Sequence, residues 1–151
     1  MRIRKANIAD VKAIHRLVNE FAKKGQMIPR ALNDLYENLR DLSVCEDRGE
    51  IQGVCALHVL WEDLAEVRSL AVRQDAQKSG LGRRLVTTCL KEASKLGITK
   101  VFALTYQADF FKKLGFREVD KAKLPQKIWG ECLRCPKFPE CDETAVILHL
   151  K

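Results

Sequence analysis

The sequence predicts a mixed α/β (α+β) domain in which a twisted central sheet of about seven strands is flanked by about four helices. Two observations predict it. Short apolar segments with strand periodicity alternate with amphipathic helical patterns, and one strand is followed by a glycine-containing turn and a long helix. At 151 residues the chain is long enough for one domain with a sizeable core and short for two, so we expect a single domain over residues 1–151.

The first helices are predicted from apolar residues at helical spacing. A short strand over Arg2–Lys5 precedes a helix with apolar residues over Ile8–Phe21 and a natural stop at Gly25. A second helix is expected over Ala31–Leu39. We expect the segment between the two helices to be an exposed elbow, because Pro29 biases the residue before it toward an extended conformation.

The middle of the chain predicts three antiparallel strands in succession. Leu42–Glu46 and Ile51–Leu60 flank the tetrapeptide Asp47–Glu50, which is a good hairpin turn. The third strand covers Ala65–Val72. Alternation along it places four side chains on one face, those of Glu66, Arg68, Leu70 and Val72.

The second half of the chain alternates between helix and strand. The expected order is a helix over Leu81–Leu96, a strand over Val101–Thr105, a short helix from Ala108, and strands over Phe116–Val119 and Thr144–Leu150. A long connection separates the last two strands.

The turn between the third strand and its helix predicts a pyrophosphate site. Its two glycines let a ligand approach the backbone, and the first free N–H groups of the helix, with the positive end of its dipole, face any bound anion. The pattern is neither a Walker loop nor a dinucleotide fingerprint. The predicted phosphate-binding residues are Gln77, Lys78, Ser79, Gly80, Leu81, Gly82 and Arg83.

Composition narrows the class of partner. The net charge of +7 favours polyanions such as nucleic acid or the phosphates of coenzyme A. Basic residues are interspersed with Asp and Glu and not interleaved with aromatics, which disfavours nucleic acid. The longest apolar runs are strand-sized, and the charged start Met1–Lys5 is no signal peptide, so we predict a cytoplasmic protein without a membrane segment.

The turn and its flanking elements resemble motif A of the Gcn5-related N-acetyltransferase (GNAT) family, which reads Gln or Arg, two residues, Gly, one residue, Gly or Ala. Ala108–Phe116 resembles the motif B helix of that family with its terminal Gly-Phe. The resemblance implies the GNAT fold, whose sheet splays open to admit acetyl-CoA. It also implies contacts with the cosubstrate from the strand residues Leu70, Ala71 and Val72 and from the motif B residues Asp109, Phe110 and Phe111.

Glu66 is the leading candidate for the general base. A carboxylate on a central strand is costly to bury unless it is paired, and GNAT members frequently place a glutamate here that acts through a water. The alternative is a structural ion pair between Glu66 and Arg68. Many members use a tyrosine as general acid at the position of Phe111, which cannot donate a proton. Thr105 or Tyr106 could supply a hydroxyl instead, and Thr105 is preferred because Tyr106 could merely cover the core.

A closer resemblance, from about Lys24 to Trp129, points to the acetyltransferase domain of N-acetylglutamate synthases, in a short form without the preceding amino-acid-kinase domain. It implies acetylation of the α-amine of L-glutamate. Arg30 would hold a carboxylate of the substrate. The other implied substrate contacts are backbone N–H groups near Ile28 and Ser69 and the cationic side chains of Arg68 and Lys127.

The sequence leaves alternatives open for the acceptor, for catalysis and for the oligomeric state. The fold tolerates very different acceptors, so another amino acid or a small amine is one alternative, and a non-catalytic coenzyme A-binding module is another. A homodimer is also left open.

The six cysteines fall into two sets. One set lies in apolar strand or helix patterns and is expected to be reduced and buried: Cys45, Cys55 and Cys89. The other set clusters in a polar segment: Cys132, Cys135 and Cys141. The first gap in that cluster is typical of metal sites, but a structural zinc needs four ligands, so we predict no metal and keep zinc as the alternative.

Overall fold

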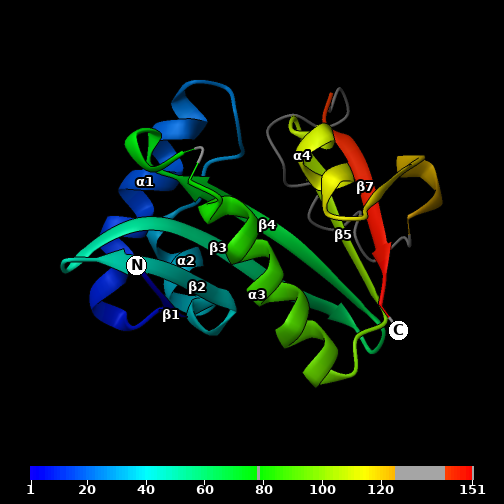
Figure 1. The fold of residues 1–151 in the computed structure, drawn as a ribbon, viewed down its shortest axis with the longest axis horizontal. Coiled ribbons are helices and arrows are strands. Elements are labelled where there is room, and N and C mark those ends of the chain that lie inside the picture. The colour runs from blue at the N-terminus through cyan, green and yellow to red at the C-terminus, as the bar shows by residue number, and fades with distance from the viewer. Residues whose placement is uncertain (78, 125–141, 151) are drawn as a thin grey trace.

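The computed structural model describes residues 1–77, 79–124 and 142–150. Its centre is a seven-stranded sheet in the order β1-β2-β3-β4-β5-β7-β6 (Figure 1). The strands are β1 (Arg2–Lys5), β2 (Leu42–Asp47), β3 (Glu50–Trp61), β4 (Leu64–Val72), β5 (Lys100–Thr105), β6 (Arg117–Val119) and β7 (Thr144–His149). Neighbouring strands run antiparallel, except that β4 and β5 are parallel.

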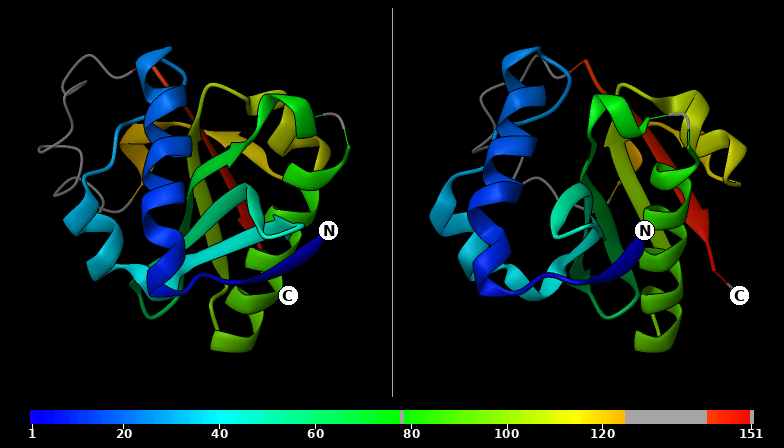
Figure 2. Two further views of the ribbon diagram at one scale, coloured as in Figure 1. Left: turned by 90° about the vertical axis from the view of Figure 1, so that its left-hand side faces the viewer. Right: turned by 60° about the vertical axis from the view of Figure 1, so that its left-hand side comes forward.

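Helices cover both faces of the sheet. They are α1 (Val11–Lys23), α2 (Leu32–Glu37), α3 (Leu81–Leu96) and α4 (Ala108–Lys113). Figure 2 shows α1 and α2 on one side of the sheet and α3 on the other. The structure therefore confirms the predicted mixed α/β fold. None of the helices in the described part of the chain has the length and apolar composition needed to span a bilayer.

The predicted hairpin turn between β2 and β3 is confirmed. Asp47 pairs with Glu50, and the two residues between them, Arg48 and Gly49, have φ angles of 54° and 81°. A two-residue loop with positive φ at both positions matches the twist of the flanking strands. The turn sets the register of the pairs next to it, and the register shifts by one residue between Glu46 and Cys45.

The core is divided between the two faces of the sheet. On the α3 face, Leu85 and Cys89 pack with Leu57 and other buried residues, and on the α1 face Ile14 packs with Val54 and its neighbours. The predicted reduced, buried cysteines belong to the α3 side and are free thiols, as expected: Cys45, Cys55 and Cys89. A hydrogen bond with Cys89 and burial raise the pKa of Cys55 well above its ordinary value, so that thiol stays protonated at neutral pH.

The predicted alternation of side chains along β4 is wrong, because the strand contains a bulge. Arg68 pairs with Ala56 and Ala71 pairs with Val54, so β4 carries one residue more than β3 between these pairs. Ser69, inside the bulge, has a φ of 56°. An extra residue shifts the side-chain alternation by one position beyond the bulge.

As a result, the four side chains expected on one face lie on two. Leu70 and Val72 pack into the α3-side core together with Val67, whereas Ala71 packs on the α1 side. Glu66 and Arg68 precede the bulge and alternate with the core residue Val67, which places them on the opposite face. The bulge therefore places the proposed base on the face opposite Leu70 and Val72, two of the strand residues expected to contact the cosubstrate.

The sheet splays open between its two parallel strands, as predicted. β5 pairs with β4 only through Leu64, Ala65 and Glu66 among the described residues. Beyond Glu66 the two strands diverge, and the backbone of β4 from Val67 onward presents an edge toward β5. An edge of this kind can hydrogen-bond an extended ligand.

A charged cluster at the start of α1 supplies a stability prediction. Arg4 Nη1 donates to Asp10 Oδ2 at 2.7 Å, and Arg4 Nη2 donates to Glu46 Oε2 at 2.7 Å. The hydrogen bond from Arg4 is the main cause that lowers the pKa of Asp10 below its ordinary value. A carboxyl whose folded pKa is depressed stabilises the fold above its unfolded pKa and loses that contribution as pH falls through the folded pKa.

We expect Asp10→Asn to lower the free energy of unfolding by about 1.5–3 kcal/mol at neutral pH. The difference from wild type should shrink as pH falls below about 4, the ordinary pKa of the carboxyl in the unfolded chain, and on toward its lower folded pKa. Urea unfolding at several pH values measures it, with Asp75→Asn as the exposed control. A difference that is the same at pH 7 and pH 2.5 would contradict the assignment.

Candidate functional site

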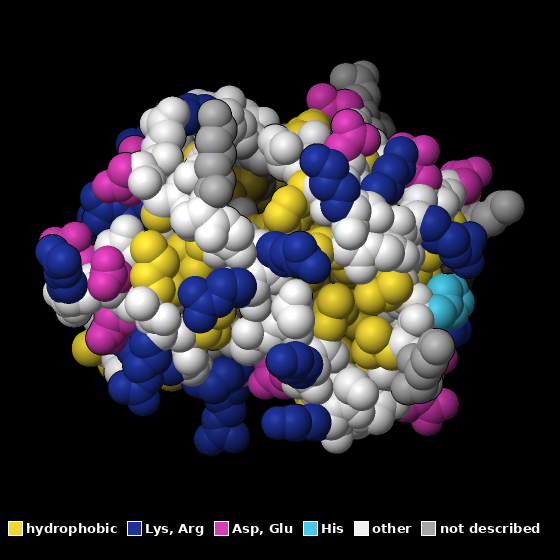
Figure 3. Space-filling model, in the orientation of Figure 1, with side chains coloured by type: hydrophobic (Ala, Val, Ile, Leu, Met, Phe, Trp, Pro, Cys, Tyr) yellow, Lys and Arg dark blue, Asp and Glu magenta, His cyan; other side chains and the backbone are white. Residues whose placement is uncertain are grey.

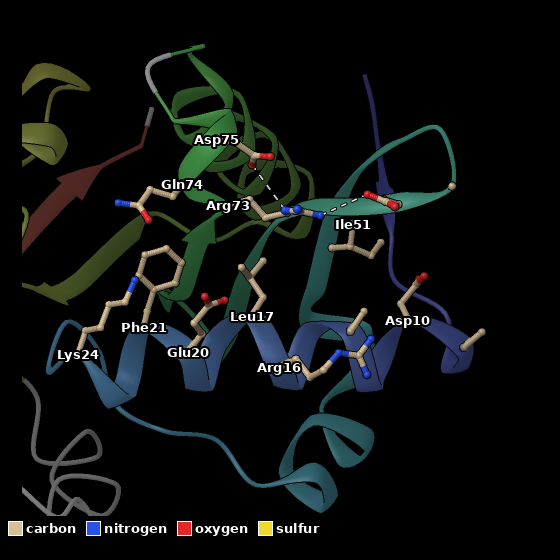
Figure 4. A pocket seen from close by; sticks show the side chains of 14 residues that line it. Asp10, Arg16, Leu17, Glu20, Phe21, Lys24, Ile51, Arg73, Gln74 and Asp75 are labelled. Carbon is tan, nitrogen blue, oxygen red and sulfur yellow. Dashed lines mark hydrogen bonds and ion pairs between the residues drawn. The ribbon is translucent and has the colours of Figure 1, made fainter.

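Two hollows are prominent in the described part of the structure. One, of about 660 Å³, lies between α1 and the loops after β2 and β4 (Figure 4). Several of its charged groups already have protein partners: Arg73 pairs with Glu50 at 3.3 Å and with Asp75 at 3.5 Å, and Asp10 pairs with Arg4. This groove gathers none of the residues that the sequence singled out for ligand binding.

The other hollow, of about 540 Å³, is the cleft where β4 and β5 diverge. Figure 3 shows it as a depression floored by hydrophobic side chains, with Lys and Arg side chains on the surrounding surface. The predicted site residues that line it are Ile28, Arg30, Glu66, Arg68, Ser69, Leu70, Ala71, Val72, Gln77, Gly80, Leu81, Gly82, Arg83, Thr105, Phe110 and Phe111. The structure thus brings together residues from five separate segments of the chain.

A few predicted residues lie elsewhere. Asp109 is exposed, and neither it nor Ser79 lines the cleft. Lys78, Lys127 and the cluster of Cys132, Cys135 and Cys141 fall outside the described residues. Within the residues that are described, no group of three or more His, Cys, Asp or Glu side chains is placed to hold a metal ion.

The turn before α3 has the form of an anion cradle. Gly80 has a φ of 80°, a left-handed conformation that glycine adopts without strain, and a Cβ there would point into open space. The first helical hydrogen bond runs from Arg84 N–H to Gly80 C=O at 3.1 Å. The N–H groups of Leu81, Gly82 and Arg83 therefore have no acceptor within the helix and are available to an anion.

Neighbouring contacts shape this turn. Ser79 Oγ donates to Ala76 C=O at 2.6 Å, and Gln77 Nε2 donates to Val72 C=O at 3.0 Å. A Cβ at Gly82 would lie 3.4 Å from the Phe110 ring, so glycine lets that ring close over the turn. These residues fit a pyrophosphate at the helix N-terminus, with the ring of Phe110 beside it.

Glu66 and Arg68 are buried side by side on β4. They are 8% and 9% exposed, and Arg68 Nη1 lies 3.9 Å from Glu66 Oε1. The contact is at the upper limit for an ion pair. Across the strand pair, His58 is the direct partner of Glu66, and its Nδ1 lies 2.6 Å from Asp41 Oδ2.

The end of β5 supplies two hydroxyl groups. Thr105 Oγ1 accepts a hydrogen bond from Gln107 N–H at 2.7 Å, which leaves the hydroxyl hydrogen available for another acceptor. Tyr106 donates its own hydroxyl to the Asp142 carboxylate. Phe111 is 3% exposed and its ring meets those of Phe110 and Phe116 edge to face. Of the two hydroxyls, Thr105 is therefore the better placed donor.

The segment between α1 and α2 differs from the exposed elbow that was predicted. Gly25 and Pro29 are exposed, but Met27, Ile28 and Arg30 are half-buried and line the cleft. The cause is tertiary, because the segment folds back against α1 and packs beside β4. Its position gives the cleft a second wall.

Sequence reasoning missed several residues that line the cleft, among them Phe21, Gln26 and Glu143. Glu143 is 6% exposed and precedes Thr144, which pairs with Thr105 across β7 and β5. No local pattern marks these residues, because packing between segments that are distant in the sequence brings them to the cleft.

Comparisons with known proteins agree with this geometry. The profile of the acetyltransferase (GNAT) family matches residues 11–116. The chain is 39% identical to an uncharacterized N-acetyltransferase of Chlorobaculum tepidum, over 98% of this chain and 96% of that protein. It is 35% identical to the amino-acid acetyltransferase of Mycobacterium tuberculosis, over 87% of this chain and 77% of the relative.

Solved structures give the same result. A Mycobacterium tuberculosis protein crystallised with CoA superposes with a TM-score of 0.87 at 29% identity, covering 100% of both chains. The N-acetylglutamate synthase of Neisseria gonorrhoeae, complexed with coenzyme A and N-acetyl-glutamate, superposes with a TM-score of 0.91 at 25% identity, over 99% of this chain and 35% of that one. With the family profile covering most of the chain and the cleft built from the two motifs, this protein belongs to the acetyltransferase (GNAT) family.

Proposed function

We propose that this protein transfers the acetyl group of acetyl-CoA to the α-amine of L-glutamate, the reaction that opens arginine synthesis. The protein is an acetyl-CoA-dependent amino-acid N-acetyltransferase, and glutamate is the acceptor proposed for it. The observation that carries the proposal is the pair of arginines, Arg30 and Arg68, in the wall of the cleft.

Two cations suit an acceptor with two carboxylates. Arg30 has a side chain 19% exposed, and that of Arg68 is 7% exposed. A guanidinium binds a carboxylate through two parallel hydrogen bonds, and the partly desolvated setting strengthens such pairs. Arg68 lies on the face of β4 away from Leu70 and Val72, and the backbone of Arg30 is hydrogen-bonded to α1 on that side of the sheet, so acceptor and cosubstrate would enter from different sides of the strand.

The reaction needs a proton acceptor and a departing thiolate. The amine nitrogen forms a bond to the thioester carbonyl carbon, and the carbon–sulfur bond then breaks. The proton from nitrogen passes to Glu66, directly or through a water. Coenzyme A thiol has a pKa near that of free cysteine, about 8.5, so its thiolate leaves without full protonation. The Thr105 hydroxyl would hydrogen-bond the sulfur as it departs.

Substitution at the turn tests where the pyrophosphate binds. Gly80→Asp should weaken acetyl-CoA binding by at least about tenfold, because it adds a negative charge at the helix N-terminus. Gly80→Asn is the matched control, since asparagine has the same size, tolerates left-handed backbone and carries no charge. Calorimetric titration measures both dissociation constants. If the aspartate variant folds and binds as wild type does, the pyrophosphate lies elsewhere.

The acceptor is tested by an assay of free thiol released from acetyl-CoA. The amines to compare are glutamate, glutamine, aspartate and an uncharged primary amine. We expect glutamate to give the highest kcat/KM, with glutamine much poorer because it lacks the second negative charge. Equal rates with all four would remove the glutamate assignment and leave the general acetyltransferase. Thiol release with none of them would favour a binding module.

A further inference from the structure

We propose that Asn19, on α1, is a positioning residue that holds Arg30 in the acceptor wall of the cleft. The proposal rests on the proposed function, in which Arg30 binds a carboxylate of the acceptor. Asn19 does not line the cleft itself. It acts instead by hydrogen-bonding the backbone of Arg30, which follows it by eleven residues in the sequence.

The contact is a paired hydrogen bond between one side chain and one backbone residue. Asn19 Nδ2 donates to Arg30 C=O at 2.9 Å, and Arg30 N–H donates to Asn19 Oδ1 at 3.1 Å. The amide thus satisfies both polar groups of the Arg30 backbone, as a neighbouring strand would. The second Nδ2 hydrogen is donated to His15 C=O at 2.8 Å, one turn earlier in α1.

These contacts specify asparagine. The site needs an acceptor for the Arg30 N–H and two donors for the carbonyl groups, and a primary amide provides both on a short side chain. Asparagine in the middle of a helix is otherwise unfavourable, because its side chain competes for backbone hydrogen bonds. Here the Asn19 side chain makes two of its three hydrogen bonds to the Arg30 backbone, and these bonds hold the Arg30 segment against α1.

The Arg30 side chain is constrained at its other end as well. Its Nη1 lies 3.5 Å from Asp34 Oδ2, and Asp34 in turn accepts from Asn38 Nδ2 at 3.0 Å. With the backbone held by Asn19 and the guanidinium held by Asp34, Arg30 is presented to the cleft in one arrangement. Pre-organisation of this kind raises affinity because less conformational freedom is lost on binding.

Asn19→Leu removes all three hydrogen bonds while keeping a side chain of similar shape. We expect it to raise the KM for glutamate by about tenfold, the equivalent of one or two net hydrogen bonds. The acetyl-CoA dissociation constant should stay within about twofold of wild type, because the cosubstrate turn lies on other elements. Thr88→Val, which removes a comparable bond to Arg84 C=O at 2.9 Å on α3, is the control.

A double-mutant cycle with Arg30→Ala separates a positioning role from a merely structural one. If Asn19 acts through Arg30, Asn19→Leu should change kcat/KM less than about twofold when Arg30 is already alanine. Thermal melting and acetyl-CoA titration confirm that each variant is folded. Fully additive losses, an equal loss of acetyl-CoA affinity, or a wild-type KM in Asn19→Leu would each overturn the proposal.

The acceptor panel is measured first, which keeps the two proposals separate. If the wild-type protein prefers another amino acid, the glutamate assignment fails, and the cycle is run with that preferred acceptor. Coupling between Asn19 and Arg30 would then still support the positioning role, whereas independent effects would refute it.

Discussion

Glu66→Gln is expected to lower kcat by about 10²–10⁴-fold and to leave the affinity for acetyl-CoA unchanged. Glutamine keeps the shape of the side chain but cannot take a proton from the attacking amine. Glu66 lies on the face of β4 opposite Leu70 and Val72 and apart from the turn before α3, so the change should not reach these proposed cosubstrate contacts. Steady-state kinetics with the preferred acceptor and calorimetric titration of acetyl-CoA measure the two quantities.

The competing explanation is a structural ion pair with Arg68, 3.9 Å away. Loss of a purely structural carboxylate would lower the melting temperature and leave kcat within about twofold, a difference of roughly 0.4 kcal/mol. Glu143→Gln makes the same chemical change at another buried cleft carboxylate and should lower kcat less. A larger loss at Glu143 than at Glu66 would transfer the role of base to Glu143.

The pH profile adds a third readout. Without a base, only amine that is already deprotonated can react, so kcat/KM of Glu66→Gln should keep rising with pH up to the pKa of the acceptor amine. The wild-type profile should level off earlier because the carboxylate accepts the proton. Parallel profiles for the two proteins would contradict a role for Glu66 in proton transfer.

Much of the fold could be predicted because its signals are local. The helix over Leu81–Leu96 and the strands around it follow from the period of their apolar residues, and the hairpin at Arg48 and Gly49 follows from turn chemistry. The cosubstrate turn was likewise visible, since its glycines and the helix after it are contiguous in the sequence. In each case neighbours in the chain determine the structure.

The remainder depends on contacts between distant segments. Alternation assumes a regular strand, and nothing in the residue type of Ser69 indicates that β4 gains an extra residue there relative to β3. The burial of Met27 and Ile28 depends on the fit of their segment against α1 and β4. Pairing of His58 with Glu66 likewise requires the strand register, which a single sequence gives only when every turn is known.

Arg30→Ala is the second substitution for which we expect a large effect. The kcat/KM for glutamate should fall roughly 30- to 900-fold, which corresponds to a rise of about 2–4 kcal/mol in the activation free energy. The loss is large because the substrate carboxylate would still be desolvated in the cleft but would lose its bidentate partner. Acetyl-CoA affinity should change little. Arg40→Ala, which removes an exposed arginine from the stretch after α2, is the control for a general change of charge.

The acceptor panel shows which carboxylate Arg30 binds. If it binds the side-chain carboxylate, Arg30→Ala should lose most of the wild-type preference for glutamate over glutamine. The variant would lack the cation that pairs with the charge by which the two amino acids differ. If it binds the α-carboxylate, both amino acids should lose activity equally and the preference should persist. Arg30→Lys should fall between wild type and alanine, since lysine keeps the charge but not the paired geometry. Unchanged kcat/KM for every acceptor in Arg30→Ala would remove Arg30 from the site, and with it the main physical support for a dicarboxylate substrate.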